Sequence, residues 1–196
     1  MLKIDSVSFS YGKEKILDSF SLDLPNKGVF SIMGPSGCGK STLFSIIGGL
    51  LKPTSGTVEH DFRRIAFAFQ DARLMPWMTS AENVNYVLGG KKSTLEAACK
   101  ALTEVGLDGS TEKYPSELSG GMKKRVSLAR AFAYDGDFLL LDEPLTGIDD
   151  EMKERIIEKL VETGKEKLVL MITHDISEAE KCSEEIFDFY KLMKKQ

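Results

Sequence analysis

The sequence predicts a doubly wound α/β domain built on a mostly parallel sheet, and three observations lead to that fold class. Short, fully apolar runs are typical of strands buried inside a parallel sheet. Helical patterns alternate with these runs along the chain, in the order that βαβ units require. A longer helical stretch, at about 71–134, is predicted to be an insert between two strands. The apolar strands are expected at 29–33, 138–141 and 168–173, and the flanking helices at 42–50 and 151–163.

The first part of the chain is predicted to form strands outside this buried set. Residues 2–24 alternate weakly between apolar and polar side chains, which favours strands that curl around Tyr11 and Gly12. Residues 53–56 combine Pro and Gly and are expected to form a turn. The apolar run 64–69 is interpreted as a core strand that ends at Gln70.

The helical insert shows the local signals of helix starts and faces. Thr79 with Glu82, and Ser93 with Glu96, have the spacing of capping boxes. Leu95, Ala98, Leu102 and Val105 repeat at the helical period, so they are expected to share one face. A further long helix is predicted at 123–134.

Composition limits the function classes. A chain of 196 residues allows one domain with a sizeable core. Its formal net charge of −4 argues against broad nucleic-acid binding, which usually needs a basic excess. The sequence shows neither a long apolar run nor the apolar stretch of a signal peptide, so a cytoplasmic protein is expected, with any membrane role acting through a partner. The three scattered cysteines are expected to be reduced thiols, and the two histidines are too few to suggest zinc.

The segment 34–41 fits the phosphate-binding pattern G-x-x-x-x-G-K-[ST], between an apolar strand and a helix. Its glycines let backbone N–H groups turn toward phosphate oxygens, and the dipole of the following helix adds positive charge there. Lys40 is expected to reach the β- and γ-phosphates, and Ser41 to ligate Mg²⁺. The alternative is a Gly-rich turn that carries a lysine by chance. The flanking elements favour a nucleoside triphosphate site.

Asp142 and Glu143 follow the apolar strand 138–141. Carboxylates at the carboxyl end of a parallel strand lie where open α/β sheets bind ligands. Asp142 is predicted to hold Mg²⁺, and Glu143 to act as the general base that polarises the attacking water. On its own, this acidic pair would be interpreted as two ordinary surface residues. Together with the phosphate-binding loop, it predicts a site for Mg²⁺ and the attacking water.

Ser119, Gly120 and Gly121 stand before the long helix and would expose N–H groups to an anion. An ordinary N-cap with a flexible lead-in is the simpler reading. A second phosphate-type site in one chain makes sense, however, if it serves the nucleotide of another copy.

With these motifs in this order, from about Tyr11 to His174, the chain resembles the ATPase subunit of an ABC transporter. The resemblance implies a P-loop NTPase core with a small, trimmed antiparallel β-subdomain and an inserted helical subdomain. It also implies ATP and Mg²⁺ as cofactors and a homodimer that sandwiches nucleotide. Glu143, His174 and Gln70 would be catalytic, and Ser41, Gln70 and Asp142 would hold the metal. The nucleotide would contact Tyr11, Gly34, Pro35, Ser36, Gly37, Cys38, Gly39, Lys40, Ser41, Thr42, Ser119, Gly120, Gly121 and Asp149.

The domain expected from the resemblance covers 1–196, with a core of 1–70 and 135–196 and a helical subdomain of 71–134. Tyr11 would stack on adenine, Asp149 would lie in the loop that crosses the dimer interface, and His174 would be the switch histidine. Met122 departs from the family pattern, where Gln is frequent, and so do residues 146–149, where smaller residues are commoner. None of these departures touches the phosphate chemistry.

Rival members of the same superfamily act on chromosomes, DNA repair or ribosomes. They carry a long coiled coil or two ATPase domains, and this sequence shows neither sustained heptads nor the required length. The stretch 70–79 and Met122 are similar to the ATPases of nitrate, sulfonate, taurine and thiamine-precursor importers. Uptake of a small solute is therefore expected, and lipoprotein extraction, export or a cell-division role is the alternative.

The resemblance also predicts the partners and the location. Transmembrane permease subunits would dock near 70–78, a separate solute-binding protein would deliver the cargo, and the ATPase would lie on the cytoplasmic face of the membrane. Nucleic acid is not expected as a partner. Trp77, the only tryptophan, would line the docking groove or, alternatively, pack inside the helical subdomain.

Overall fold

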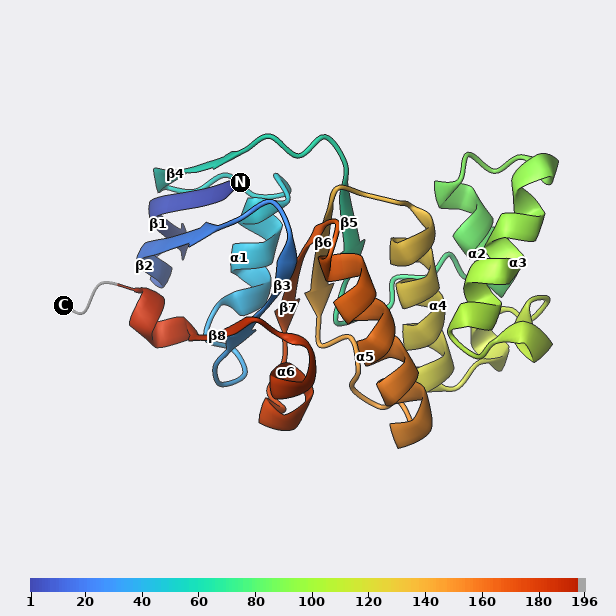
Figure 1. Cartoon of the computed structure of the whole chain (residues 1–196). Helices are drawn as coiled ribbons and strands as arrows, with labels where there is room; N and C mark the ends of the chain where they lie inside the picture. The colour runs from blue at the N-terminus through green and yellow to red at the C-terminus, as the bar shows by residue number, and fades with distance from the viewer. Residues whose placement is uncertain (194–196) are drawn as a thin grey trace.

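The computed structural model describes residues 1–193, which form two sheets and a group of helices (Figure 1). The larger sheet has five parallel strands in the order β5-β6-β7-β3-β8. The smaller, antiparallel sheet has the order β2-β1-β4. This arrangement confirms the predicted α/β fold class with a mostly parallel sheet and a small antiparallel one.

The three central strands of the parallel sheet are almost wholly buried, as their apolar sequences require. They are β3 (Gly28–Met33), β6 (Phe138–Asp142) and β7 (Leu168–Ile172). Alternate residues of each strand point to opposite faces. In β6, Phe138 and Leu140 pack with helix α1 (Lys40–Ile47), whereas Leu139 and Leu141 pack with helix α5 (Asp150–Gly164). Both faces are therefore covered by helices, which completes the doubly wound pattern.

The edges of the sheet differ from the expectation. β5 (Ile65–Ala68) was predicted to be a core strand, but it is an edge strand and only half-buried. The opposite edge is β8 (Glu185–Asp188), which follows helix α6 (Ile176–Cys182). Neither α6 nor β8 was predicted, because both are short and carry mixed polar and apolar residues. A last 3₁₀ turn, η4 (Phe189–Leu192), contacts the antiparallel sheet at the left of Figure 1.

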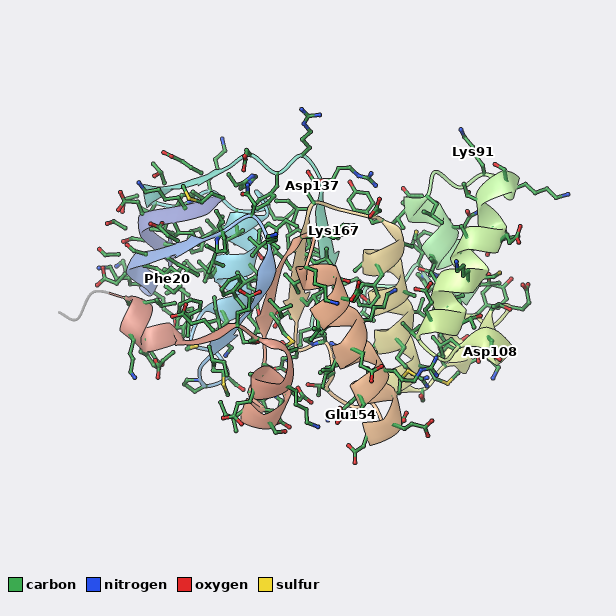
Figure 2. The ribbon with its side chains drawn as sticks, viewed as in Figure 1. Phe20, Lys91, Asp108, Asp137, Glu154 and Lys167 are labelled. Atoms are coloured by element: carbon green, nitrogen blue, oxygen red, sulfur yellow. The ribbon has the colours of Figure 1, made fainter. Side chains whose placement is uncertain are left out.

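The antiparallel sheet consists of β1 (Leu2–Tyr11), β2 (Glu14–Leu24) and β4 (Ser55–His60). Gly12, at a φ of +58°, makes the tight turn between β1 and β2, as the sequence predicted. Phe20 of β2 is fully buried against Phe189, with ring centroids 5.5 Å apart, and lies inside this end of the molecule (Figure 2). This contact joins the antiparallel sheet to η4.

The helices between β5 and β6 have a small core of their own, at the right of Figure 1. They are α2 (Ser80–Val87), α3 (Leu95–Glu104) and α4 (Gly120–Ala133), joined by the 3₁₀ turns η1 (Lys92–Thr94), η2 (Asp108–Ser110) and η3 (Pro115–Glu117). The division into a core and a helical subdomain stays a prediction. Helix α4 also contributes Leu128 and Ala131 to the core beneath the parallel sheet.

The predicted helix starts can be compared with the N-caps that the structure shows. Thr79 and Glu82 form the predicted capping box, with both reciprocal bonds present. The box predicted at Ser93 does not form, because the 3₁₀ turn η1 places Thr94 at the N-cap of α3. Helix α4 starts at Gly120, with Ser119 as its N-cap, three residues earlier than predicted. The two glycines thus belong to the first turn of the helix.

No helix within residues 1–193 is long and apolar enough to cross a bilayer.

Candidate functional site

A cavity of about 270 Å³ opens at the carboxyl edge of the parallel sheet. Because the strands run in the same direction, the segments that follow β3, β5 and β6 meet at this edge. The opposite edge, where Asp137 and Lys167 lead into β6 and β7, lies at the top of Figure 2. The cavity is lined by Tyr11, Ile16, Ser36, Gly37, Gly39, Lys40, Ser41, Thr42, Gln70, Asp142 and Glu143.

The loop 34–39 joins β3 to α1 and forms one wall of the cavity. Gly39 is the N-cap of α1 at a φ of +111°, so it offers no side chain to bond the first amides of the helix. A Cβ at Gly39 would come within 2.7 Å of the Ile16 side chain. Glycine is therefore required here both for its conformation and for space. The first turn of α1 presents N–H groups and its positive dipole end to the cavity, as an anion site needs.

Lys40 is buried and folds back over the loop. Its Nζ donates to the carbonyl oxygens of Gly34 at 2.8 Å and Pro35 at 2.7 Å. Cys38 Sγ lies 3.7 Å from the same ammonium group. A phosphate in the cavity would replace these two carbonyl oxygens as the hydrogen-bond acceptor of the Lys40 ammonium group. Cys38 itself lines a neighbouring hollow beside Tyr190.

Ser41 and Asp142 join the start of α1 to the end of β6. Ser41 Oγ donates to Asp142 Oδ2 at 2.6 Å. Burial raises the pKa of the Asp142 carboxyl, and the hydrogen bond from Ser41 only partly opposes this effect. A hydroxyl and a buried carboxylate are oxygen ligands of the type that Mg²⁺ prefers, and a cation would compensate the buried charge. The residues present therefore fit a magnesium ion, and Gln70 also lines the cavity.

Glu143 and His174 approach each other from the ends of neighbouring strands. Glu143 has a φ of +49°, unusual for a residue with a side chain, and its N–H donates to Ile172 O at 2.8 Å. His174 Nδ1 lies 3.5 Å from Glu143 Oε1, and Thr146 Oγ1 lies 3.4 Å from Glu143 Oε2. With this strained backbone, Glu143 lines the cavity.

Gln70 lies in a segment that helix α4 holds in place. Lys124 of α4 is 7% exposed, and its Nζ donates to the main-chain oxygen of Gln70 at 2.6 Å and, more weakly, of Phe69 at 3.4 Å. Burial lowers the pKa of Lys124, while the carboxylates of Asp142 and Glu143 oppose that effect. Sequence reasoning missed this residue. Its spacing could have shown that it is buried, because Lys124 lies four residues before Leu128 and seven before Ala131 on the buried face of α4.

Other predicted residues lie outside the cavity. Ser119 and Gly120 are exposed at the start of α4, where Ser119 Oγ accepts from Met122 N at 3.2 Å. A Cβ at Gly121 would come within 2.4 Å of Gly147 O, so this turn packs against the loop before α5. Asp149 is the N-cap of α5 and accepts from Met152 N at 3.0 Å. The structure thus does not bring these residues to their own chain's cavity.

Tyr11 and Trp77 are aromatic residues exposed at the surface. Tyr11 lies at the mouth of the cavity, edge-on to Phe9 with centroids 4.9 Å apart. Trp77 is 70% exposed, so the alternative in which it packs inside the helical subdomain is wrong. An exposed tryptophan next to Met75 and Met78 is typical of a binding surface.

The buried carboxylate leads to a prediction about stability and pH. Because the folded state raises the pKa of Asp142 above its ordinary 3.8, the folded state binds more protons than the unfolded state between the two pKa values. The stability that its protonated form contributes is lost as the pH rises through the folded pKa. Asp142→Asn should therefore raise the Tm at neutral pH, without nucleotide or metal, and the gain should shrink as the pH falls toward 3.8.

Thermal unfolding followed by circular dichroism at several pH values measures this difference. Asp108→Asn, at an exposed position far from the site (Figure 2), is the control and should show no such pH-dependent gain. A lower Tm for Asp142→Asn at neutral pH would show that its charge stabilises the fold.

Comparison with known proteins gives consistent matches. Residues 17–146 match the family model described as ABC transporter. The aliphatic sulfonates import ATP-binding protein of Escherichia coli K12 is 40% identical over 192 residues, covering 91% of this chain and 72% of that protein. The taurine import ATP-binding protein of the same strain is 38% identical over 194 residues, covering 91% and 75%.

Solved structures agree with the sequence matches. The dimeric structure of the ABC transporter cassette MJ0796 has a TM-score of 0.90 and 32% identity, covering 96% of this chain and 94% of that one. A dimeric post-hydrolysis state of the same cassette, bound to ADP and Pi, matches equally well.

Proposed function

This chain belongs to the family of ABC transporter ATPases, and from that membership we propose that it hydrolyses ATP to power the uptake of a small solute. The main support for this proposal is that one cavity brings together the start of α1, Lys40, the Ser41–Asp142 pair and Glu143. The names of the relatives make small sulfonates the first solutes to test.

ATP binding is assigned to the loop 34–39, the first turn of α1 and Tyr11. The amides at the start of α1 bind the phosphates, and Lys40 exchanges its two loop carbonyls for phosphate oxygens. Tyr11 stacks on adenine, since its ring is exposed at the mouth of the cavity. These contacts position the γ-phosphate next to Glu143.

Magnesium is proposed to be held by Ser41 and Asp142, with Gln70 beside them. When bound, the ion neutralises charge that develops on the β- and γ-phosphates. Asp142 supplies the negative charge for this site, and Ser41 holds its carboxylate toward the start of α1.

Hydrolysis is assigned to Glu143, which accepts a proton from the attacking water. The strained backbone and the bond to Ile172 O hold the carboxylate toward the cavity. His174, 3.5 Å away, is proposed to orient this carboxylate and to sense the γ-phosphate.

A second copy of the chain is proposed to complete the site. Ser119, Gly120 and Asp149 are not among the residues that line the cavity of their own chain, so they can serve the nucleotide of a partner. The matching cassette is dimeric in its solved structure. Loss of the γ-phosphate on hydrolysis would remove the bridge between the two chains and reopen the dimer.

Coupling to transport is proposed to run through the segment 70–78. Lys124 and Arg130 of α4 hold this segment by bonds to its carbonyl oxygens, including Gln70 O. Trp77 offers apolar surface to a permease subunit on the cytoplasmic face of the membrane. A separate solute-binding protein would deliver the cargo to that permease.

Reconstitution tests this function. Co-purified permease and ATPase subunits in liposomes, supplied with the solute-binding protein, should take up labelled taurine or an alkanesulfonate only with ATP and Mg²⁺. Efflux in place of uptake would contradict the import assignment, and failure to associate with any permease would contradict a transport role.

Trp77→Ala should uncouple the transporter without damaging the enzyme. Because the indole is 70% exposed, its removal should leave the Tm and the ATP hydrolysis of the isolated subunit almost unchanged. Assembly with the permease, or transport per ATP hydrolysed, should fall. Tyr86→Ala is the matched control, since Tyr86 is an aromatic residue on α2 that is 59% exposed. Wild-type transport by Trp77→Ala would remove Trp77 from the docking surface.

A further inference from the structure

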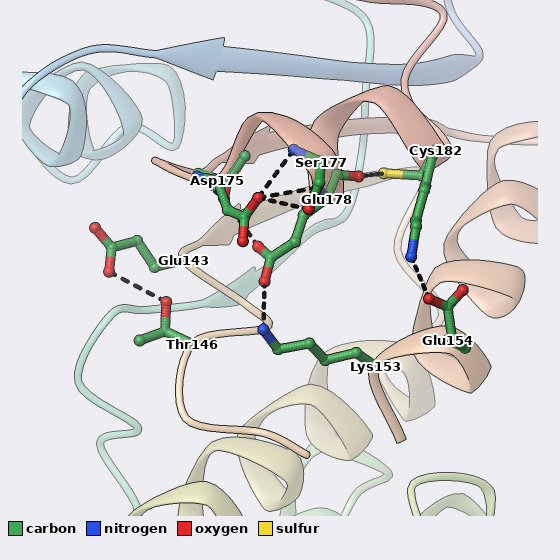
Figure 3. Close-up of polar contacts among 10 residues, drawn as sticks. Glu143, Thr146, Lys153, Glu154, Asp175, Ser177, Glu178 and Cys182 are labelled. Carbon is green, nitrogen blue, oxygen red and sulfur yellow. Dashed lines mark hydrogen bonds and ion pairs between the residues drawn. The ribbon is translucent and has the colours of Figure 1, made fainter. Parts of the chain in front are cut away.

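Glu178 of α6 is a buried carboxylate that no step described so far uses. It is 6% exposed, and both of its oxygens have partners on other segments (Figure 3). Thr173 Oγ1 donates to Glu178 Oε2 at 3.0 Å, and Lys153 Nζ lies 2.9 Å from Glu178 Oε1. A buried charge is retained only when it is paired and hydrogen-bonded, so these contacts are needed to keep the carboxylate in place.

On one side, Glu178 holds the loop that carries His174. The Thr173 hydroxyl, which is buried, donates to Glu178 and accepts from Asp175 N at 3.1 Å. Thr173 and Asp175 are the two neighbours of His174 in the chain. The Glu178 carboxylate therefore fixes the backbone on both sides of the histidine through a single hydroxyl.

On the other side, Glu178 holds the first turn of α5. Lys153 lies one turn after Asp149, and its N–H donates to Asp149 O at 2.9 Å. The hydrogen bond to Glu178 raises the pKa of Lys153, so the ammonium group stays charged. Movement of the Asp149 turn would be transmitted along this short path to the carboxylate.

A second ion pair joins the same two helices and provides a comparison. Lys181 of α6 pairs with Glu154 of α5, but the two side chains are about half exposed and have no bond to residues 173–175 (Figure 3). Exposed pairs of this kind contribute little to stability. Variants of the Lys181–Glu154 pair therefore test the α5–α6 contact alone, whereas variants of the Lys153–Glu178 pair also test contact with the loop that carries His174.

We propose that Glu178 is a positioning residue that links the Asp149 turn of α5 to His174, so that contact with a partner chain at Asp149 adjusts the orientation of His174 toward Glu143. This inference rests on the proposed function, in which Asp149 faces a second copy and His174 orients Glu143. The residue does not touch the nucleotide. It acts through Thr173 and Lys153.

Kinetics provide the first test. Glu178→Ala should lower kcat for ATP by roughly 10- to 100-fold, since small displacements of a catalytic group have effects of this size. The KM for ATP should change little, because the loop 34–39 is untouched. Glu178→Gln keeps an acceptor for the Thr173 hydroxyl and should therefore lose less of its kcat than Glu178→Ala. Lys153→Met should lose about as much kcat as Glu178→Gln. Glu154→Gln is the control and should match the wild type.

A spectroscopic test does not depend on activity. The chain has only two histidines, His60 and His174, so its histidine NMR spectrum can be assigned with a single His60→Gln variant. In the nucleotide-free protein, Glu178→Ala should shift or broaden the His174 resonance and leave that of His60 unchanged. Lys153→Met, which leaves the Thr173 bond intact, should have a smaller effect in the same direction.

Two results would overturn the inference. One is a His174 resonance that Glu178→Ala and Lys153→Met leave unchanged. The other is a loss of kcat in Glu154→Gln as large as that in Glu178→Gln, which would reduce the role to helix packing. If the proposed function is wrong, the wild type will release no phosphate from ATP. The NMR experiment would still test whether Glu178 positions His174.

Discussion

Glu143→Gln should stop ATP turnover while ATP binding persists. Glutamine has the same shape but cannot accept the proton of the attacking water, and general-base catalysis accounts for roughly 10²- to 10⁴-fold in rate. The backbone bond from Glu143 N to Ile172 O does not involve the side chain, so the site should keep its geometry. ATP that cannot be hydrolysed should hold two copies together, and the variant should accumulate as an ATP-dependent dimer.

Phosphate release and size-exclusion chromatography with ATP measure the two parts of this prediction. Glu158→Gln removes a carboxylate from an exposed position on α5 and should behave as the wild type. Hydrolysis at a normal rate by Glu143→Gln would exclude Glu143 as the base. A monomer that binds ATP without hydrolysing it would instead contradict the nucleotide sandwich.

Lys40→Ala should fail one step earlier, at nucleotide binding. The variant removes the buried ammonium group that now donates to Gly34 O and Pro35 O and is expected to exchange onto the phosphates. Hydrogen bonds to charged groups contribute about 1.5–3 kcal/mol, so affinity should fall by roughly 10- to 100-fold. Fluorescence titration with an ATP analogue measures the affinity, and the rate should fall as well.

Gly120→Asp is the informative contrast to Lys40→Ala. A Cβ at Gly120 meets no atom within 4 Å, and an aspartate in the first turn suits the dipole of α4, so the monomer should fold normally. Gly121 is less suitable, because its Cβ would lie 2.4 Å from Gly147 O and would disturb the loop before α5. Gly120→Asp should bind nucleotide as the wild type does but should not dimerise. Identical binding isotherms for the Lys40 and Gly120 variants would contradict the two-chain site.

Local sequence determined the central part of the fold. The buried strands β3, β6 and β7 are continuous apolar runs, and each lies within a residue of its prediction. The phosphate-binding loop was predictable for the same reason, because glycines, a lysine and a serine at fixed spacing must follow a strand and open a helix. Thr79 and Glu82 formed the predicted capping box because both partners lie within one turn.

Errors arose where the structure depends on distant segments. β5 was predicted to be a core strand from its apolar residues, but its position at the edge follows from strand order, which hydrophobicity does not encode. The box at Ser93 failed because the 3₁₀ turn before α3 moved the N-cap by one residue. The segments α6 and β8 are too short and mixed to show a period.

The residues with phosphate and metal chemistry could be identified from short motifs, because the spacing of those residue types is local to one stretch of chain. How these residues face one another depends on the packing of the folded chain. It brought Ser41 to 2.6 Å from Asp142 across the sheet, exposed Trp77, and buried Lys124 and Glu178 beside the loops that carry Gln70 and His174. Those contacts join segments far apart in the chain, and the packing of helices on the sheet, which no local pattern records, sets their geometry.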